Sequence, residues 1–441
     1  MMSNHRHQRA VGQGFFHTAQ LTEHGRVRLR YVYDCGAMRK YASARDNRID
    51  TYINTEGVGR LLDVLFLSHI HYDHVSGIER LLASRTGLTV DTIVLPLLNV
   101  ADRLIAYARA TAEEPGIAGD DFYRALIIDP TTTLSRFGPR QIIFVRRGNP
   151  DGGPPGSKGP DDSGGGDRHG LEIYGRRGEW GLAWKLIGSG RADQVNPSAD
   201  TPGIASSRES VTIIDDTLAF AMPSAPSSTS AFAEWLLAPF VDPTVSAKRH
   251  KFMRALADSR SMTVPTLEKW LEQVSNVHDL VVNGLPDLAT AYGAIEPDFN
   301  ITSLCLYSGP RPVAHAVPKA HGGQFGSWSK TIAASDRIAW LGTGDAALAS
   351  TARSTAFSRH YGQLLAEVIT LTLPHHGSDH NLSPKLIKSI GAELFVAAAD
   401  QFAKWRHPGS RTVQVVAELG RFVSTVTSAH ASEIEEVGVI L

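Results

Sequence analysis

Three histidines and one aspartate lie within six consecutive residues of this 441-residue chain: His69-Ile70-His71-Tyr72-Asp73-His74. In an extended or turning loop, side chains two residues apart point the same way, so His69 and His71 can bind one metal ion. Asp73 and His74 can then turn toward a second ion. Imidazole and carboxylate ligands suit zinc, and also manganese or iron. We therefore expect two divalent metal ions, with zinc as the first choice and manganese as the alternative.

Further metal-binding side chains follow later in the chain, each after an apolar run. They are Asp345 after residues 338–344, His375 and His376 after residues 368–373, and His407 after residues 393–399. Each ion of a dinuclear site needs four or more donors, and a carboxylate at a strand end can bridge two ions. Any one of these residues alone would more often be an ordinary turn, surface or core residue. Their shared position predicts that they complete one site.

The apolar runs themselves predict the strands that position these residues. Residues 61–67 are too few for a helix and suit a buried strand that ends at Ser68-His69. Ahead of this strand, two β-rich runs flank a Thr22-Glu23-His24-Gly25 turn, which predicts a hairpin over residues 12–34. The other predicted elements are a helix over residues 75–84 and strands over residues 92–98, 303–307, 337–342, 368–373 and 393–399. Strands and helices therefore alternate at both ends of the chain, as in an α/β fold.

The middle of the chain has a different composition. Residues 148–170 are rich in Gly, Pro, Ser and Asp and predict a mobile loop. Residues 230–274 carry a helical spacing of apolar side chains, including Phe232, Trp235 and Leu236. We therefore expect one domain in two halves, residues 1–98 and 296–441, separated by a large α-rich insertion over residues 99–295.

These segments together resemble the metallo-β-lactamase superfamily, and within it the hydrolase domain of the ComEC/Rec2-like competence proteins. The matching pieces are Tyr33-Asp34-Cys35-Gly36, the His69 to His74 cluster, Asn300 and Ser303, Thr343-Gly344-Asp345, His375-His376-Gly377-Ser378 and Arg406-His407-Pro408. They lie in residues 11–98 and 296–441, and the residues between resemble no family that we can name. The resemblance implies a four-layer αββα sandwich, built from the two ends of the chain.

The resemblance also implies a role for each residue of the first cluster. His69 and His71 would bind the first ion, and Asp73 and His74 would bind the second. Asp345 would bridge the two ions. The histidine that many members of the superfamily place between the first cluster and the bridging aspartate has no clear equivalent here. The first site would then be weaker, or the protein would hold one ion tightly.

The later histidines take their expected roles from the same resemblance. Either His375 or His376 would complete the second site. We assign His375 as that ligand and expect Asp73, His376 and His407 to be catalytic residues, although a structural role fits His407 nearly as well. Asp34 would support the metal-binding loop by hydrogen bonds, a kind of outer contact on which metal sites depend.

Two divalent ions a few ångströms apart would lower the pKa of a water molecule that they bind. They would also stabilise the charge that grows on the attacked centre, so the ligand set predicts hydrolysis. The resemblance favours a phosphodiesterase or nuclease that acts on nucleic acid or on a small phosphorylated compound. The same chemistry suits the carbonyl of a lactone, thioester or lactam. A different alternative is a metal-stabilised binding component of a multiprotein defence or DNA-processing system.

The composition restricts the partners and the compartment. Lys and Arg (44) balance Asp and Glu (45), so the net charge of -1 gives no global attraction to nucleic acid. Two cysteines, Cys35 and Cys305, cannot build a disulfide framework or a thiolate metal cage. The polar start does not resemble a signal peptide, and no apolar run is long enough to span a membrane. We expect a cytoplasmic protein without membrane contact, whose insertion is available to a protein partner.

Overall fold

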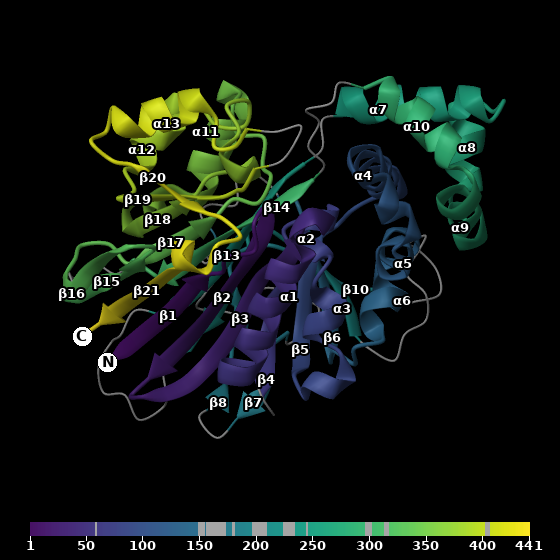
Figure 1. The fold of residues 1–441 in the computed structure, drawn as a ribbon. Coiled ribbons are helices and arrows are strands. Elements are labelled where there is room, and N and C mark those ends of the chain that lie inside the picture. Colours follow the sequence, from purple (N-terminus) through teal and green to yellow (C-terminus); the bar gives the residue numbers. More distant parts are fainter. Residues whose placement is uncertain are drawn as a thin grey trace.

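The computed structural model describes residues 1–57, 60–148, 155, 173–178, 181–195, 210–223, 234–243, 246–295, 302–312, 317–401 and 406–441. The predicted mobile loop falls outside the described residues, apart from Gly148 and Pro155. The described part is a mixed α/β fold with two large mixed sheets and helices around them (Figure 1).

The first sheet joins the two ends of the chain. Its eleven strands run in the order β10-β11-β6-β5-β4-β3-β2-β1-β21-β15-β16. Their bounds are β1 Met2–Gln8, β2 Gly14–Glu23, β3 Arg26–Ala37, β4 Leu61–Phe66, β5 Thr89–Pro96, β6 Gln141–Arg146, β10 Ala192–Gln194, β11 Ser210–Asp215, β15 Lys319–Phe325, β16 Trp328–Ala334 and β21 Ile434–Ile440. Strands β3, β4, β5, β6 and β11 are parallel, and the other pairs are antiparallel. The predicted hairpin is confirmed as β2 and β3.

The second sheet has eight strands in the order β20-β19-β18-β17-β14-β13-β12-β9. Their bounds are β9 Lys185–Ile187, β12 Ala219–Met222, β13 Trp235–Asp242, β14 Ser303–Pro310, β17 Ala339–Gly342, β18 Val368–Thr372, β19 Leu394–Ala398 and β20 Val423–Val426. Two short strands, β7 Arg177–Gly178 and β8 Gly181–Leu182, form a separate pair. Strands β17 to β20 are parallel. The four strands predicted late in the chain are therefore confirmed as β14, β17, β18 and β19.

Among the described residues, the α-helices lie between strands along the chain. They are α1 Ala42–Tyr52, α2 Tyr72–Val75, α3 Ile78–Leu81, α4 Val100–Glu113, α5 Asp121–Ile128, α6 Pro130–Ser135, α7 Ser246–Ser259, α8 Val264–Trp270, α9 Val274–Asn283, α10 Leu285–Gly293, α11 Thr351–Tyr361, α12 Pro384–Ile390 and α13 Ser410–Ala417. Among the residues that the structure describes, no helix is long and apolar enough to cross a membrane.

The single helix predicted over residues 75–84 is instead divided into α2 and α3. The break occurs at Gly77, whose N–H donates to the carbonyl of Cys35 on β3 at 2.8 Å. A Cβ at Gly77 would lie 2.7 Å from the Ile49 side chain and 2.9 Å from the Cys35 carbonyl oxygen, so only glycine lets the chain approach β3 this closely. This contact ties the segment that carries Asp73 and His74 to the first sheet.

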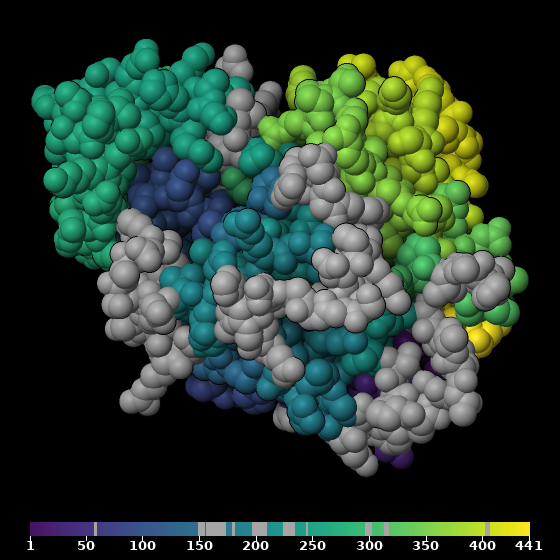
Figure 2. Space-filling view, turned by 180° about the vertical axis from the view of Figure 1, so that it is seen from behind, coloured from purple at the N-terminus to yellow at the C-terminus, as the bar shows by residue number. Residues whose placement is uncertain are grey.

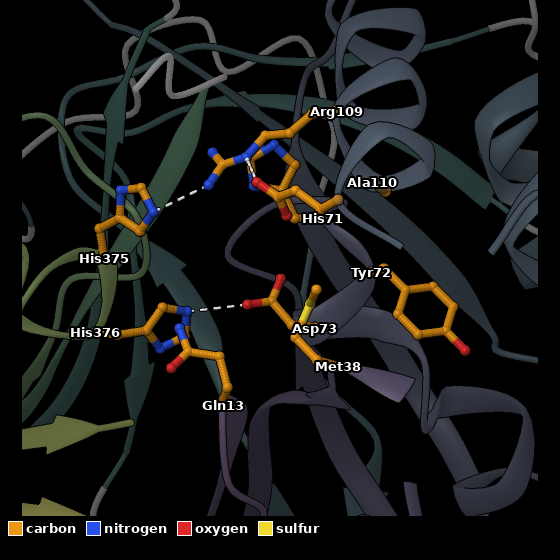
Figure 3. A pocket seen from close by; sticks show the side chains of 10 residues that line it. Gln13, Met38, His71, Tyr72, Asp73, Arg109, Ala110, His375 and His376 are labelled. Atoms are coloured by element: carbon orange, nitrogen blue, oxygen red, sulfur yellow. Dashed lines mark hydrogen bonds and ion pairs between the residues drawn. The ribbon is translucent and has the colours of Figure 1, made fainter. Parts of the chain in front are cut away.

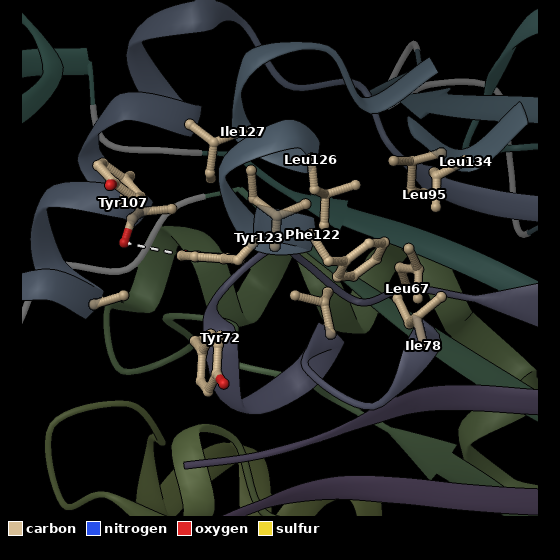
Figure 4. Close-up of a cluster of buried hydrophobic side chains, with 14 of the residues drawn as sticks. Leu67, Tyr72, Ile78, Leu95, Tyr107, Phe122, Tyr123, Leu126, Ile127 and Leu134 are labelled. Carbon is tan, nitrogen blue, oxygen red and sulfur yellow. Dashed lines mark hydrogen bonds between the residues drawn. The ribbon is translucent and has the colours of Figure 1, made fainter. Parts of the chain in front are cut away.

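Three large apolar clusters, with a smaller fourth between the two sheets, hold the layers together. Tyr31 and Phe66 of the first sheet pack with Phe220, Trp235 and Trp340 of the second. Burying each such ring contributes about 4 to 6 kcal/mol of transfer free energy, so this cluster fixes the two sheets face to face. A second cluster packs the first sheet against helices including α1, α4 and α5, and Figure 4 shows part of it at α4 and α5. A third packs the second sheet against α11, α12 and α13.

The prediction that residues 99–295 form an α-rich insertion is wrong for part of that segment. Strands β6 and β11 belong to the first sheet, and β9, β12 and β13 belong to the second. Trp235, which the sequence placed in a helical run, begins β13, and every residue of Trp235–Asp242 is buried. A strand buried on both faces has a continuous apolar pattern without a period of two, so spacing alone cannot distinguish it from a helix.

Helices do fill the end of this segment. Residues 246–293 form α7 to α10, and α10 packs against both α7 and α4. Figure 2 shows residues 246–295 lying over α4 at one side of the molecule, with the C-terminal residues at the other side. The helical part of the expected insertion therefore covers α4, the helix that follows strand β5.

Candidate metal centre

The predicted site residues come together where parallel strands of both sheets end. His69 follows β4, while Asp345, His375 and His407 follow β17, β18 and β19. The carboxyl ends of parallel strands meet at one edge of a sheet, and two sheets packed face to face bring two such edges side by side. The backbone N–H of Leu304 on β14 donates to the Ser68 carbonyl at 2.7 Å, which joins the sheets at this edge.

The first group of donors consists of His69, His71 and Asp345. His69 Nε2 lies 3.1 Å from His71 Nδ1, and Asp345 Oδ2 lies 3.5 Å from the former and 3.6 Å from the latter. Donors that share one tetrahedral zinc ion at roughly 2.0 to 2.1 Å lie about 3.3 Å from one another. The triangle formed by these three atoms therefore has the size that a shared ion requires.

The second group consists of Asp73, His74 and His376, again with Asp345. His376 Nε2 lies 3.0 Å from Asp73 Oδ2, and His74 Nε2 lies 3.8 Å from the same oxygen and 3.5 Å from Asp345 Oδ1. Asp345 thus presents one carboxylate oxygen to each group. His74 Nε2 and Asp345 Oδ1 are buried and have no hydrogen-bond partner among the described residues, as expected of atoms whose partner is a cation.

Asp34 fixes the orientation of the histidines from behind. Its Oδ2 accepts hydrogen bonds from Ser68 Oγ at 2.6 Å and from His74 Nδ1 at 2.8 Å, and its Oδ1 accepts from the Ser68 backbone at 2.6 Å. Ser68 Oγ in turn lies 2.8 Å from His69 Nδ1. Because Nδ1 of each histidine is occupied, His69 and His74 both direct Nε2 toward the donor groups, as metal-ligating histidines do.

Burial and neighbouring charges set the protonation states of the donors. Burial and the nearby Arg109 guanidinium lower the pKa of His71 to about 3, and burial and His74 lower the pKa of His69. Burial opposes the ionised form of Asp73, yet His74 and His376 lower its pKa overall. His69 and His71 therefore offer neutral imidazoles and Asp73 an ionised carboxylate, the forms that bind metal.

His74 differs from the other two histidines of its loop. Burial disfavours its charged form, but the carboxylates of Asp73 and Asp34 outweigh burial and raise its pKa well above the ordinary value. Two carboxylates that face one imidazole concentrate negative charge at this point. A divalent cation would neutralise the same charge.

His375 and His376 lie on a strained turn. Both have positive φ angles, 49° and 56°, and Asp34 has a φ of 58°. Three of the five non-glycine residues with positive φ in the described part of the chain thus belong to this site. Such conformations are unfavourable for L residues and gather at functional sites.

The turn sends the two imidazoles in different directions (Figure 3). His376 faces Asp73 and is held from behind by a 2.7 Å hydrogen bond from Nδ1 to the Ala398 carbonyl. His375, which the sequence analysis assigns as the ligand, faces Arg109 instead. Its Nε2 lies 3.1 Å from Arg109 Nη2 and 3.9 Å from Asp345 Oδ2. The geometry therefore favours His376 as the histidine of the second group and places His375 beside the first.

The remaining predicted residues lie at different distances from the donors. The His407 ring centroid is 5.6 Å from that of His375 and 6.2 Å from that of His376, and burial together with His376 lowers the pKa of His407 to about 4. Ser303 Oγ accepts a hydrogen bond from the Asp345 backbone at 3.1 Å. Asn300, which the resemblance also included, lies outside the described residues.

The sequence has no clear equivalent of the histidine that many superfamily members place between the first cluster and Asp345. His321 lies in that interval but is buried on β15, where its Nε2 lies 3.0 Å from Glu436 Oε1 in a network with Arg6. His315 lies in the same interval and is outside the described residues.

Sequence reasoning missed the contribution of the segment after β5. Tyr72, between two site residues, packs its ring edge to face on Tyr123 of α5 at 5.3 Å (Figure 4), and its hydroxyl donates to Asp120. Arg109 of α4 lines the pocket with His71, as Figure 3 shows. An arginine within an apolar helical run, four residues before Glu113, was the available signal for a buried charge with a specific partner.

No protein-family model matches the chain, and no curated protein matches it. The donor groups, and the fold that places them, are therefore the features of this chain that bear on its function.

Proposed function

We propose that this chain is a metal-dependent hydrolase of the metallo-β-lactamase fold that cleaves phosphodiester bonds. The observation that carries the proposal is the shared carboxylate of Asp345, with Oδ2 beside His69 and His71 and Oδ1 beside His74. One carboxylate between two sets of imidazoles is the arrangement that a two-metal site needs. A structural zinc site would need only one closed set of four ligands.

The three large apolar clusters support the fold assignment. One cluster packs helices against the first sheet, one packs the first sheet against the second, and one packs the second sheet against further helices. This order supports an αββα sandwich, with the site at the strand ends between the two sheets. Both ends of the chain contribute to the first sheet of this sandwich, because β1 pairs with β21.

The proposed ligands are His69, His71 and Asp345 for one ion, and Asp73, His74, His376 and Asp345 for the other. Two divalent cations held there would act as Lewis acids and would lower the pKa of a water molecule toward neutrality. The hydrolysis adds water across one P–O bond and yields a phosphomonoester and an alcohol. The Asp73 carboxylate is ionised and the His69 and His71 imidazoles are neutral, which are the forms that bind metal, and Asp34 holds Nδ1 of His74 directly and Nδ1 of His69 through Ser68.

Phosphodiesters are favoured over carbonyl substrates because of the cation in the pocket wall. Arg109 is buried beside His71 and His375. An arginine suits the charged oxygens of a phosphodiester, whereas the neutral carbonyl of a lactone or thioester offers it no negative charge before attack.

The test is hydrolysis of bis(p-nitrophenyl) phosphate, with single- and double-stranded DNA and RNA in parallel, by protein loaded with zinc or manganese. Asp73→Ala removes a donor of the second group, and Asp50→Ala makes the same change at a half-exposed ion pair on α1. We expect turnover in the wild type and in Asp50→Ala and its loss in Asp73→Ala. No turnover of any phosphodiester by protein shown to contain metal would refute the proposed activity.

A further inference from the structure

The pocket beside the donor groups has one wall that comes from helix α4. Arg109 is only 5% exposed and lines this pocket together with His71, Asp73, His375 and His376. Figure 3 shows its guanidinium extending from α4 toward His375, with Asp73 and His376 on the opposite side of the pocket. A buried cation therefore faces the space in which a substrate would meet the metal ligands.

The guanidinium is held in a defined orientation. Its Nε donates to Glu113 Oε1 at 2.9 Å, one helical turn further along α4, and its Nη2 lies 3.1 Å from His375 Nε2. The contacts of Nε with Glu113 and of Nη2 with His375 together fix the plane of the group and place one terminal nitrogen beside the donor groups. Burial disfavours the charge, but Glu113, Tyr292 and Asp345 raise the pKa of Arg109 overall.

Helix α4 is itself firmly anchored. Asn99 caps its first turn by accepting a hydrogen bond from the Asp102 backbone at 2.8 Å. The Asp102 carboxylate then receives two hydrogen bonds from Arg249 of α7, at 2.9 and 2.8 Å. Both contacts hold the first turn of α4, and a side chain on a helix anchored in this way is positioned more precisely than one on a loop.

We infer that Arg109 is a substrate-binding residue that holds a non-bridging anionic oxygen of the phosphodiester, an inference that rests on the proposed function. Charge-assisted hydrogen bonds from a planar guanidinium match a phosphate oxygen in geometry as well as in charge. The bonds to such an oxygen strengthen as negative charge grows on the phosphate during attack. Helix α4 then belongs to the catalytic pocket.

The experiment compares the wild type with Arg109→Gln and Arg109→Lys, after equal metal content per chain has been shown for all three. One substrate is bis(p-nitrophenyl) phosphate, which is anionic. The other is diethyl p-nitrophenyl phosphate, a triester with the same leaving group and no anionic oxygen. Binding of inorganic phosphate to each metal-loaded protein is measured by calorimetry. Arg124→Ala, an arginine on the surface of α5, is the control.

We expect Arg109→Gln to lower kcat/KM on the diester by about 100-fold, the loss typical of one transition-state hydrogen-bond donor, and to change triester hydrolysis little. Arg109→Lys should retain part of the activity, because lysine keeps the charge but not the planar fork. Phosphate affinity should fall in Arg109→Gln and remain unchanged in Arg124→Ala.

Two results would overturn the inference: equal losses on diester and triester, or equal phosphate affinity in the wild type and Arg109→Gln. Failure of the proposed function looks different, because the wild type itself would then hydrolyse no phosphodiester. In that case phosphate binding alone decides the role of Arg109.

Discussion

Nε2 of His376 lies 3.0 Å from Oδ2 of Asp73, although 303 residues separate them in the sequence. The contact joins a turn after β18 of the second sheet to α2, which follows β4 of the first. It exists because parallel strands of two packed sheets end at the same place. It also distinguishes His376 from its neighbour His375, which faces Arg109.

This relationship predicts that the two adjacent histidines contribute differently to metal binding. His376→Ala should reduce the metal bound per chain, because the second group loses one of its imidazoles. His375→Ala should retain more metal, since its Nε2 is 3.9 Å from the nearest oxygen of Asp345. Elemental analysis after dialysis measures both variants side by side. Greater loss from His375→Ala would show that His375 is the ligand.

Asp34→Asn should weaken metal binding without removing a ligand. The amide cannot accept all three of the hydrogen bonds from Ser68 and His74 that the carboxylate accepts. Loss of such an outer contact typically lowers metal affinity by about 10- to 100-fold. Competition with a chelator measures the change. Asp63→Asn is the matched control, because Asp63 is equally buried on β4 but bonds to Arg30 and Arg176 instead. An unchanged affinity in Asp34→Asn would contradict this role.

Gly344→Ala should damage the site more than the fold. Gly344 has a φ of 49°, and an added Cβ would lie 2.7 Å from Ser303 Oγ and 2.8 Å from Ser68 Cβ. Relieving these contacts would displace the neighbouring Asp345 from between the donor groups. Gly420→Ala is the control, because Gly420 has a similar φ of 68° but nothing within 4 Å of the added Cβ.

Both glycine variants should lose about 1 to 2 kcal/mol of stability from the left-handed backbone alone. Only Gly344→Ala should also lose metal and hydrolysis. Thermal unfolding and metal analysis separate the two effects. Equal metal content in both variants would mean that Asp345 tolerates the displacement.

Glu436 should contribute stability that is lost in acid. Its carboxylate bonds to Arg6 at 2.9 Å and to His321 at 3.0 Å in the interior of the fold. Burial raises the pKa of Glu436, but Arg6 and His321 outweigh it and lower the pKa below the ordinary value of 4.5. A folded-state pKa below the unfolded one gives stability that is fully present above about pH 4.5 and lost as the pH falls further.

Glu436→Gln leaves the Arg6 guanidinium buried without its counter-charge, which costs about 3 to 5 kcal/mol at neutral pH. The variant should also lose less stability than the wild type between pH 4.5 and lower pH. Urea unfolding across this range tests the prediction. If the free energy of unfolding fell equally with pH in the two proteins, the pKa of Glu436 would not differ between the folded and unfolded states.

The donor residues and most of their strands could be predicted from the sequence, because a short apolar run followed by histidine or aspartate is a local pattern. His69, Asp345 and His376 each follow such a run. Which of His375 and His376 faces the second donor group could not be predicted from the sequence, because it depends on positive φ angles at both residues. Arg109 was missed for a different reason: its contact with His375 spans 266 residues, and no local pattern encodes such a pairing.

If two metal ions share Asp345, anomalous diffraction from crystals of the zinc-loaded protein should show both of them. We expect two anomalous peaks about 3.5 to 4 Å apart, one on each side of the Asp345 carboxylate. One peak would lie beside His69 and His71, and the other beside Asp73, His74 and His376. A single peak, or zinc bound away from Asp345, would mean that this carboxylate does not bridge two ions.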